Sequence, residues 1–330
     1  SLGTPKAILP FTEKYPKNRL GLANWLFEEK NSLTARVAVN RLWQQFFGVG
    51  IVSTSADFGN QGALPTHTDL LDWLELTFQE EGWYLKKMIK RLVTSSTYQQ
   101  TSKTTPELQE IDPQNQWLAR SSRSKLSAEM IRDNALSVSG LLVNRIGGPS
   151  VKPYQPEGLW AETTSGQGLT KYYMDSGENQ YRRSLYTFWK RTVPPPAMMT
   201  FDAASRDNCE VVRQKTSTPL QALVMLNDPQ LIEAAETMAA NIVKDEKLND
   251  DQRNRKIFRK ITSREQNDSE IKSLHTYLSE SEKEFRNKND VLQVKAFTKA
   301  TKSSPSKEKV IAFSALASLI FNLDEAIVKG

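Results

Sequence analysis

The stretch TARVAVNRLWQQFFG, residues 34–48, indicates the fold class of this chain. Its apolar side chains recur at helical spacing, and a row of polar side chains follows the same period. The apolar row is Ala35, Val39, Leu42 and Phe46, and the polar row is Arg36, Asn40 and Gln44. Gly48 is a typical residue for ending a helix. We therefore expect a helix over 32–47 that holds polar groups beside a core.

Length and composition limit the number of domains and the kinds of partner that we expect for this chain. Its 330 residues exceed the usual size of one hydrophobic core, which predicts one large domain or two closely packed ones. No apolar run approaches the roughly 20 residues that span a bilayer, so we expect no membrane span in this chain. The net charge is +6, but acidic and basic residues are mixed between Lys244 and Lys309, which disfavours a nucleic-acid groove.

Few residues are suited to bind a soft metal ion. The chain has one cysteine, Cys209, and two histidines, His67 and His275, so it forms no internal disulfide and no cysteine-rich metal site. It has no Cys-x-x-Cys-His motif for covalent haem attachment. We therefore expect no cofactor within this chain. Calcium binding is left as an alternative, although the chain has no Asp-x-Asp-x-Asp-Gly loop to support it.

Helix signals recur along the chain, and they predict a mainly α fold, an irregular multi-helix bundle with a long loop and short β excursion in its middle. Residues 147–202 lack helical periodicity, and Arg182–Arg191 alternates like a strand. We expect residues 1–240 to form a helical core that includes this excursion, and residues 241–330 to form a C-terminal helical segment packed on it. The further helices are predicted over 19–29, from Thr66 to Gly82, and over 84–94, 251–262, 269–285 and 307–322, with starts at Ser127, Thr218 and Asp228 and a linker over 287–306.

Several segments together resemble one known family. They include Asn31–Gly50, Ser55–Gly59, Pro65–His67, Val93–Tyr98, Gly147–Ser150, Arg182–Tyr186, Pro194–Pro196, Phe201–Asp202 and Thr218–Leu223. In order and spacing they are similar to the planctomycete-specific domain of unknown function, family 1553. The similarity extends over most of the chain.

This resemblance implies a mainly helical module that follows a second domain of unknown function, and often a cytochrome c domain, in large exported bacterial proteins. It also implies a periplasmic or cell-surface location and a connection to polysaccharide use. The partners it implies are upstream domains of the same protein or partner subunits. The family supplies no established catalytic residues.

Three residues are candidates for acid–base catalysis, namely Asp57, His67 and Asp202. An imidazole near carboxylates can act as a general base or a ligand. Alternatively, His67 lies at the first turn of a helix and only forms local hydrogen bonds.

Eight residues are candidates for ligand binding. Arginines and an amide could bind a carboxylate or sulfate, and aromatic rings in the excursion could stack on sugars, although salt bridges between helices and ordinary packing explain the same residues. The candidates are Arg36, Asn40, Arg41, Arg132, Arg183, Trp160, Tyr172 and Tyr173.

These patterns leave two main hypotheses for function. The first is an exported accessory or binding module that docks partner domains and, through residues 147–202, a glycan. The second is an enzyme acting on sulfated polysaccharide with a carboxylate, histidine and arginine site. A nucleic-acid-binding role has only the basic isoelectric point in its favour.

Overall fold

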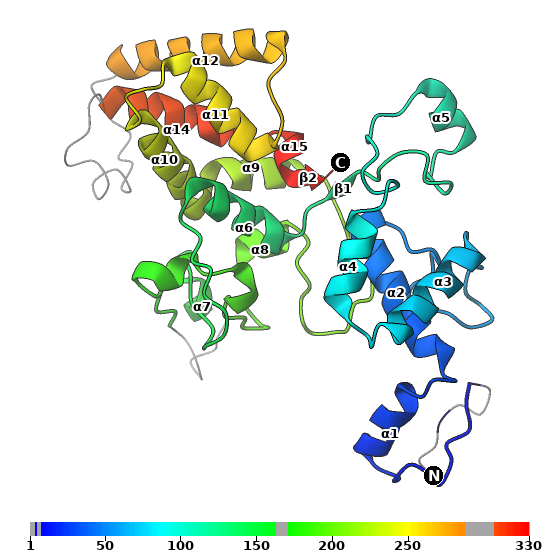
Figure 1. Cartoon of the computed structure of the whole chain (residues 1–330). Coiled ribbons are helices and arrows are strands. Elements are labelled where there is room, and N and C mark those ends of the chain that lie inside the picture. Colours follow the sequence, from blue (N-terminus) through cyan, green and yellow to red (C-terminus); the bar gives the residue numbers. More distant parts are fainter. Residues whose placement is uncertain (1–3, 5–7, 163–170, 288–306, 330) are drawn as a thin grey trace. The chain divides into compact units, whose positions relative to one another are not determined.

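The computed structural model describes residues 4, 8–162, 171–287 and 307–329, and it is mainly α-helical, which confirms the predicted fold class (Figure 1). The chain divides into two compact units, Ser1–Ser124 (unit 1) and Lys125–Lys329 (unit 2). The predicted division near residue 240 falls inside a helix of unit 2, and no boundary near residue 124 is predicted from the sequence. None of the helices in the described ranges is long and apolar enough to cross a membrane.

Unit 1 is a small helical bundle. Its helices are α1 (Arg19–Leu26), α2 (Ser32–Phe47), α3 (Thr68–Glu80), α4 (Leu85–Val93) and α5 (Pro106–Ile111). Helix α2 packs on α3 and α4, and its buried apolar residues are Ala35, Val39, Trp43 and Phe47, whereas Leu42 and Phe46 of the predicted apolar row are only partly buried. The rings of Trp43 and Phe47 stack with centroids 3.9 Å apart in the core. The helix predicted from residues 32 to 47 is confirmed at both ends.

Asn40 connects α2 to the loop that follows it. Its side chain is fully buried, its Nδ2 donates to the Val52 carbonyl at 3.0 Å, and its Oδ1 accepts from the Val52 amide at 2.9 Å. A Cβ at Gly50 would lie only 2.5 Å from Asn40 Nδ2, so only glycine fits there. Of the polar row of α2, Asn40 therefore braces the Gly50–Val52 loop.

The start of α3 differs from the prediction. Thr66 does not cap it: the N-cap is His67, which makes no capping hydrogen bond with its side chain. The Thr66 hydroxyl instead donates to the Ile51 carbonyl at 3.3 Å. The sequence predicts the N-cap of α3 to within one residue. The Thr66 hydroxyl, however, hydrogen-bonds to the loop that contains Ile51 and does not cap the helix.

Unit 2 contains most of a short two-stranded sheet and the remaining helices. They are α6 (Ala128–Ser139), α7 (Leu159–Glu162), the 3₁₀ turns η1 (Gly177–Tyr181) and η2 (Ser184–Tyr186), α8 (Pro196–Thr200), α9 (Pro219–Asn227), α10 (Pro229–Val243), α11 (Asp250–Thr262), α12 (Asp268–Asn287), α14 (Lys307–Phe321) and α15 (Asp324–Ile327). Strand β1 (Ser124–Lys125) pairs with β2 (Val328–Lys329). The helices predicted over 251–262, 269–285 and 307–322 are confirmed within two residues, and most of the predicted linker lies outside the described residues.

The core of unit 2 is centred on α10 and α14. Helix α10 packs against α14 and α6, and α14 also packs against α12. Small residues line the contact, with Ala234, Ala239, Ala312 and Ala317 each fully buried. Because alanine projects little beyond the backbone, the two helices can approach closely and Phe313 and Leu316 fill the space around them.

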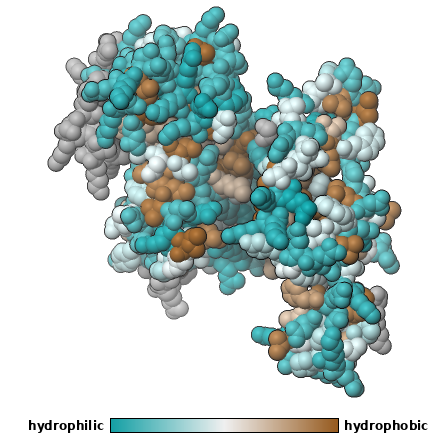
Figure 2. Space-filling view, viewed as in Figure 1, coloured by the Kyte–Doolittle hydropathy of each residue, from teal (hydrophilic) through white to brown (hydrophobic). Residues whose placement is uncertain are grey.

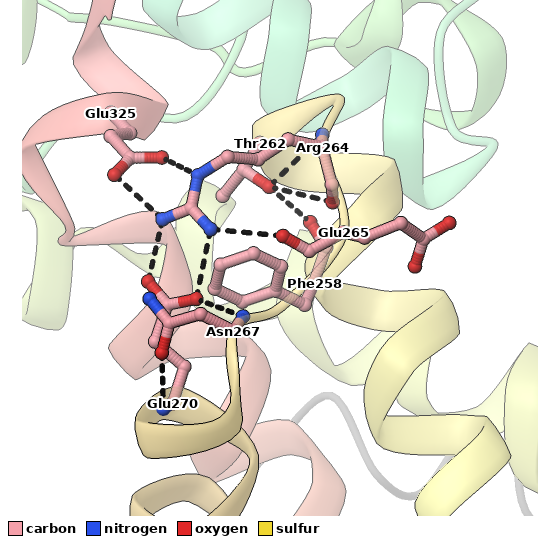
Figure 3. Close-up of polar contacts among 7 residues, drawn as sticks. All are labelled: Phe258, Thr262, Arg264, Glu265, Asn267, Glu270 and Glu325. Atoms are coloured by element: carbon pink, nitrogen blue, oxygen red, sulfur yellow. Dashed lines mark hydrogen bonds and ion pairs between the residues drawn. The ribbon is translucent and has the colours of Figure 1, made fainter.

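A charged clasp holds the turn between α11 and α12 to α15 (Figure 3). Arg264 donates from Nη1 to Glu270 Oε2 at 2.8 Å and from Nε to Glu325 Oε2 at 2.6 Å, and its guanidinium carbon lies 4.9 Å from the centre of the Phe258 ring. These hydrogen bonds raise the pKa of Arg264 and lower the pKa of Glu270. We name Arg264, Glu270 and Glu325 the C-terminal clasp.

The strand predicted over Arg182–Arg191 is wrong. The structure has η2 at Ser184–Tyr186, and only isolated bridges, Val143 to Arg182, Val151 to Thr187 and Lys190 to Val193, resemble sheet pairing. The alternation is nonetheless real, since Arg182 is fully buried while the Arg183 side chain is 52% exposed. The alternation reflects packing against an irregular loop rather than against a sheet.

Candidate functional site

A cavity of about 60 Å³ lies within unit 2, between α6, α8 and the start of α10. Its walls are mostly apolar, with Arg132, Thr187, Asp228 and Gln230 as the polar exceptions. The apolar lining includes Ala128, Ile131, Leu136, Pro153, Tyr154, Pro195, Met198, Phe201, Val224 and Leu231. The space is large enough for a few water-sized groups or for the end of one apolar side chain.

Arg132, a predicted ligand-binding residue, lies in the wall of this cavity. All three guanidinium nitrogens donate within the protein: Nε to Gln230 Oε1 (2.6 Å), Nη1 to the Arg182 carbonyl (2.9 Å) and Ser184 Oγ (3.1 Å), and Nη2 to the Gln180 carbonyl (2.8 Å). Burial lowers the pKa of Arg132, while the charges of Asp133 and Asp228 act in the opposite direction. The geometry is that of a brace between α6 and the 177–184 segment.

Two aspartates lie near Arg132, and of these only Asp228 lines the cavity. Asp133 Oδ1 accepts from the Ser184 amide and hydroxyl, both at 2.7 Å, and its Oδ2 lies 3.8 Å from Nε of Arg183. Asp228 caps α10 by accepting from the Gln230 amide at 2.9 Å and the Leu231 amide at 3.3 Å. Burial raises the pKa of Asp228 even though these amides and Arg132 favour its charged form.

The aromatic candidates of the excursion divide by exposure. Trp160 is only 3% exposed, its Nε1 donates to Gln155 Oε1 at 2.9 Å, and the Tyr172 ring lies 5.1 Å from it. The Tyr172 hydroxyl donates to the Pro153 carbonyl at 2.5 Å. Tyr173 is 70% exposed. Ordinary packing accounts for Trp160 and Tyr172, and of the three predicted rings Tyr173 is the accessible one.

The model of the PSD1 family, described as proteins of unknown function (DUF1553), matches residues 18–278. The chain belongs to this family. The match confirms the resemblance inferred from sequence, and it extends from the start of α1 into α12. No match was found among the curated proteins or among the solved structures.

One segment that carries the family resemblance, Gly147–Ser150, wraps around the buried Arg182. Arg182 Nη2 donates to the carbonyls of Arg145, at 2.9 Å, and Gly147, and Nη1 donates to the Pro149 carbonyl at 3.1 Å. The guanidinium carbon lies 3.9 Å from the centre of the Tyr186 ring, and the Tyr186 hydroxyl accepts from the Gly147 amide at 2.7 Å. Two glycines with positive φ, Gly147 and Gly148, let the chain turn closely around this cation. This part of the family pattern therefore builds a buried brace.

The candidates from α2 lie in unit 1 and serve as scaffold contacts. Arg36 pairs with Asp72 of α3, and its Nε lies 3.0 Å from Glu75 Oε2. Burial raises the pKa of Glu75, opposed by the charge of Arg36. Asn40 holds the Val52 loop as described, and Arg41 is exposed. Arg36 therefore forms salt bridges between α2 and α3, as the alternative to ligand binding expects.

The acid–base candidates are divided between the two units. In unit 1, Asp57 Oδ1 accepts from the Gly59 amide at 2.8 Å, and His67 Nδ1 lies 3.0 Å from the Thr66 hydroxyl. Asp202 is in unit 2. His67 makes a local contact, as the alternative to catalysis expects for it, and the catalytic roles of all three residues stay predictions.

Asp202 belongs to a polar cluster that includes a lysine which sequence reasoning missed. Its carboxylate accepts from the Thr216 amide at 2.7 Å and from the Thr216 hydroxyl at 2.9 Å. Lys125 donates to the Thr216 carbonyl at 2.7 Å and to Gln221 Oε1, and burial lowers its pKa. Residues so distant in sequence carry no local signal, so only the fold could bring them together. Within the described ranges, no three His, Cys, Asp or Glu side chains gather to hold a metal ion.

Proposed function

We propose that this chain is an accessory module that binds a neighbouring protein domain through the surface around the unit 2 cavity. The observation that carries the proposal is the mostly apolar cavity, which lies beside exposed leucines of α9. Leu220, Leu223 and Leu226 are 55%, 57% and 42% exposed. Val224, which lines the cavity, follows Leu220 by one helical turn and Leu223 by one residue.

A protein partner suits this surface better than a charged small molecule. The donors of Arg132 in the cavity wall are engaged by carbonyls, a hydroxyl and Gln230, so a ligand there gains mainly apolar contacts. Protein interfaces commonly use one apolar side chain inserted into a pocket and surrounded by flatter contacts. The cavity and the α9 leucines offer both parts of such an interface.

The setting of the proposal comes from the family resemblance. Modules of this kind follow other domains in exported bacterial proteins, so we expect a periplasmic or cell-surface location, an upstream domain as the partner, and a connection to polysaccharide use or to a cytochrome c domain. The expectation that this chain itself holds no cofactor stays a prediction, which elemental analysis of the purified protein would test.

Calorimetric titration of the domain that precedes this module in its parent protein tests the proposal. We expect saturable binding that Leu223→Asp weakens at least about tenfold, since a charge would be buried at the interface. Ile146→Asp is the matched control, because Ile146 is 83% exposed on unit 2 and does not line the cavity. Absence of binding, or equal weakening by both variants, would overturn the proposal.

A further inference from the structure

Helix α4 of unit 1 has a basic face that takes no part in the surface proposed above. Lys86, Lys87, Lys90 and Arg91 follow one another around the helix within a sector of about 140°. The opposite side is buried, with Met88 and Leu92 at 0% and 3% exposure. Figure 2 shows the surface over α4 as hydrophilic.

The three lysines differ from the arginine in their contacts. Arg91 pairs with Glu81 and lies over the Trp73 ring, with its guanidinium carbon 5.4 Å from the ring centre. Lys86, Lys87 and Lys90 are exposed, and none forms an ion pair with any part of the chain that the structure describes. Their charges are therefore available to an external anion.

Two partly exposed aromatic rings lie at the edge of this face. Trp73, over which Arg91 lies, is 49% exposed, and Tyr84, which precedes α4, is 51% exposed. Amphipathic rings of this kind contact the apolar faces of sugars while their polar tips stay in water. The face therefore combines unpaired positive charge with partly exposed aromatic area over a length of about two helical turns.

We propose that the basic face of α4 binds an anionic polysaccharide through its sulfate or carboxylate groups. A membrane surface is a poorer fit, because an interfacial helix must insert its apolar side, and that side of α4 forms part of the unit 1 core. Nucleic acid is a poorer fit too, because its dense line of phosphates requires an extended basic surface, whereas acidic and basic residues are nearly balanced over the whole chain.

Titration of the full chain with dextran sulfate, polygalacturonate and uncharged dextran at low salt tests this inference. We expect binding to at least one of the two charged polymers and none to dextran. The triple variant Lys86→Gln, Lys87→Gln, Lys90→Gln should weaken that binding by about 10- to 100-fold, since it removes three of the four positive charges on the face.

The matched control changes the same number of exposed lysines elsewhere in unit 1, as Lys17→Gln, Lys30→Gln, Lys103→Gln. It should leave affinity within about twofold, because distant exposed charges are screened. Equal loss in both variants would show a net-charge effect and overturn the inference. Binding to neither charged polymer, or tighter binding to single-stranded DNA or to anionic phosphatidylserine vesicles, would overturn it as well.

Discussion

Two arginines of unit 2 hold the chain together in opposite ways. Arg182 is fully buried, and its guanidinium donates to the carbonyls of Arg145, Gly147 and Pro149. Arg264 is 37% exposed at its side chain and is neutralised by two carboxylates in the C-terminal clasp. A guanidinium cannot lose its proton to escape burial, so Arg182 depends on carbonyl dipoles and the Tyr186 ring. The contacts of Arg182, which we name the brace, therefore depend on the shape of the loop that surrounds it. The C-terminal clasp depends on paired charges.

Replacing Arg182 should have the largest effect on this comparison. Arg182→Met leaves three inward carbonyls without their donor, which we expect to cost about 3–5 kcal/mol of unfolding free energy. Chemical denaturation of the full chain measures it. Arg183→Met, at an exposed neighbour, should change stability by less than about 0.5 kcal/mol. A cost below about 1 kcal/mol for Arg182→Met would contradict the brace, and Arg182→Lys, which keeps the charge, serves if the methionine variant does not fold.

Glu236 provides a buried charge that, unlike Arg182, can be neutralised. It is 7% exposed, and burial, followed by the nearby charge of Glu233, raises its pKa to about 7. The folded state therefore retains a proton that the unfolded state has already lost, so stability falls as pH rises from about 4.5 to about 7.

Glu236→Gln should remove this loss and stabilise the protein by about 1–3 kcal/mol at pH 8, with little gain at pH 4.5. Denaturation at the two pH values measures the difference. Glu246→Gln, at an exposed position, is the control and should show no such pH dependence. An equal effect of Glu236→Gln at both pH values would refute the explanation.

Breaking the clasp should cost less than breaking the brace. We expect Arg264→Met to lower the unfolding free energy by about 1–2 kcal/mol, because the ion pairs are partly exposed to water. Because Arg264 lowers the pKa of Glu270, this contribution is present above the ordinary carboxyl pKa and is lost as pH falls through the lower folded value. Arg259→Met, at a more exposed ion pair, is the control and should cost less.

The smallest expected effect is the change that salt makes to these stability costs. It distinguishes the partly exposed Arg264 from the buried Arg182 most directly. In about 1 M KCl the cost of Arg264→Met should shrink by about 0.5 kcal/mol, since screening acts on exposed charges. The cost of Arg182→Met should stay the same, because water and ions do not reach that guanidinium. Equal salt dependence for the two variants would remove the distinction between brace and clasp.

The helices were predictable where short-range chemistry decides them. The capping box of Thr218 and Gln221 starts α9, Asp228 caps α10, and Gly140 ends α6 in a left-handed conformation, as their sequence patterns indicate. The 182–191 segment was predicted wrongly because alternating burial is typical of strands, whereas here it arises from one arginine inserted into a glycine turn. Local periodicity does not distinguish these causes.

The candidate site was less predictable than the fold. Arg132 was selected from sequence, but its contacts with Gln180, Ser184 and Gln230 depend on segments about 50 and 98 residues away. Lys125 was overlooked for the same reason, since Gln221 lies 96 residues further along. Sequence patterns selected residues able to form polar clusters, but which clusters form is decided by long-range packing.

The position of α14 has a practical consequence for anyone shortening this protein. The family match ends at residue 278, whereas α14, which begins at Lys307, covers the alanine-rich side of α10. In a chain trimmed to the matched range, Ala234 and Ala239 would face solvent, because Phe313 and Leu316 of α14 would be missing. Such a fragment would expose apolar surface and self-associate during expression, so a shortened chain should keep α14 and also α15, which carries Glu325 of the C-terminal clasp.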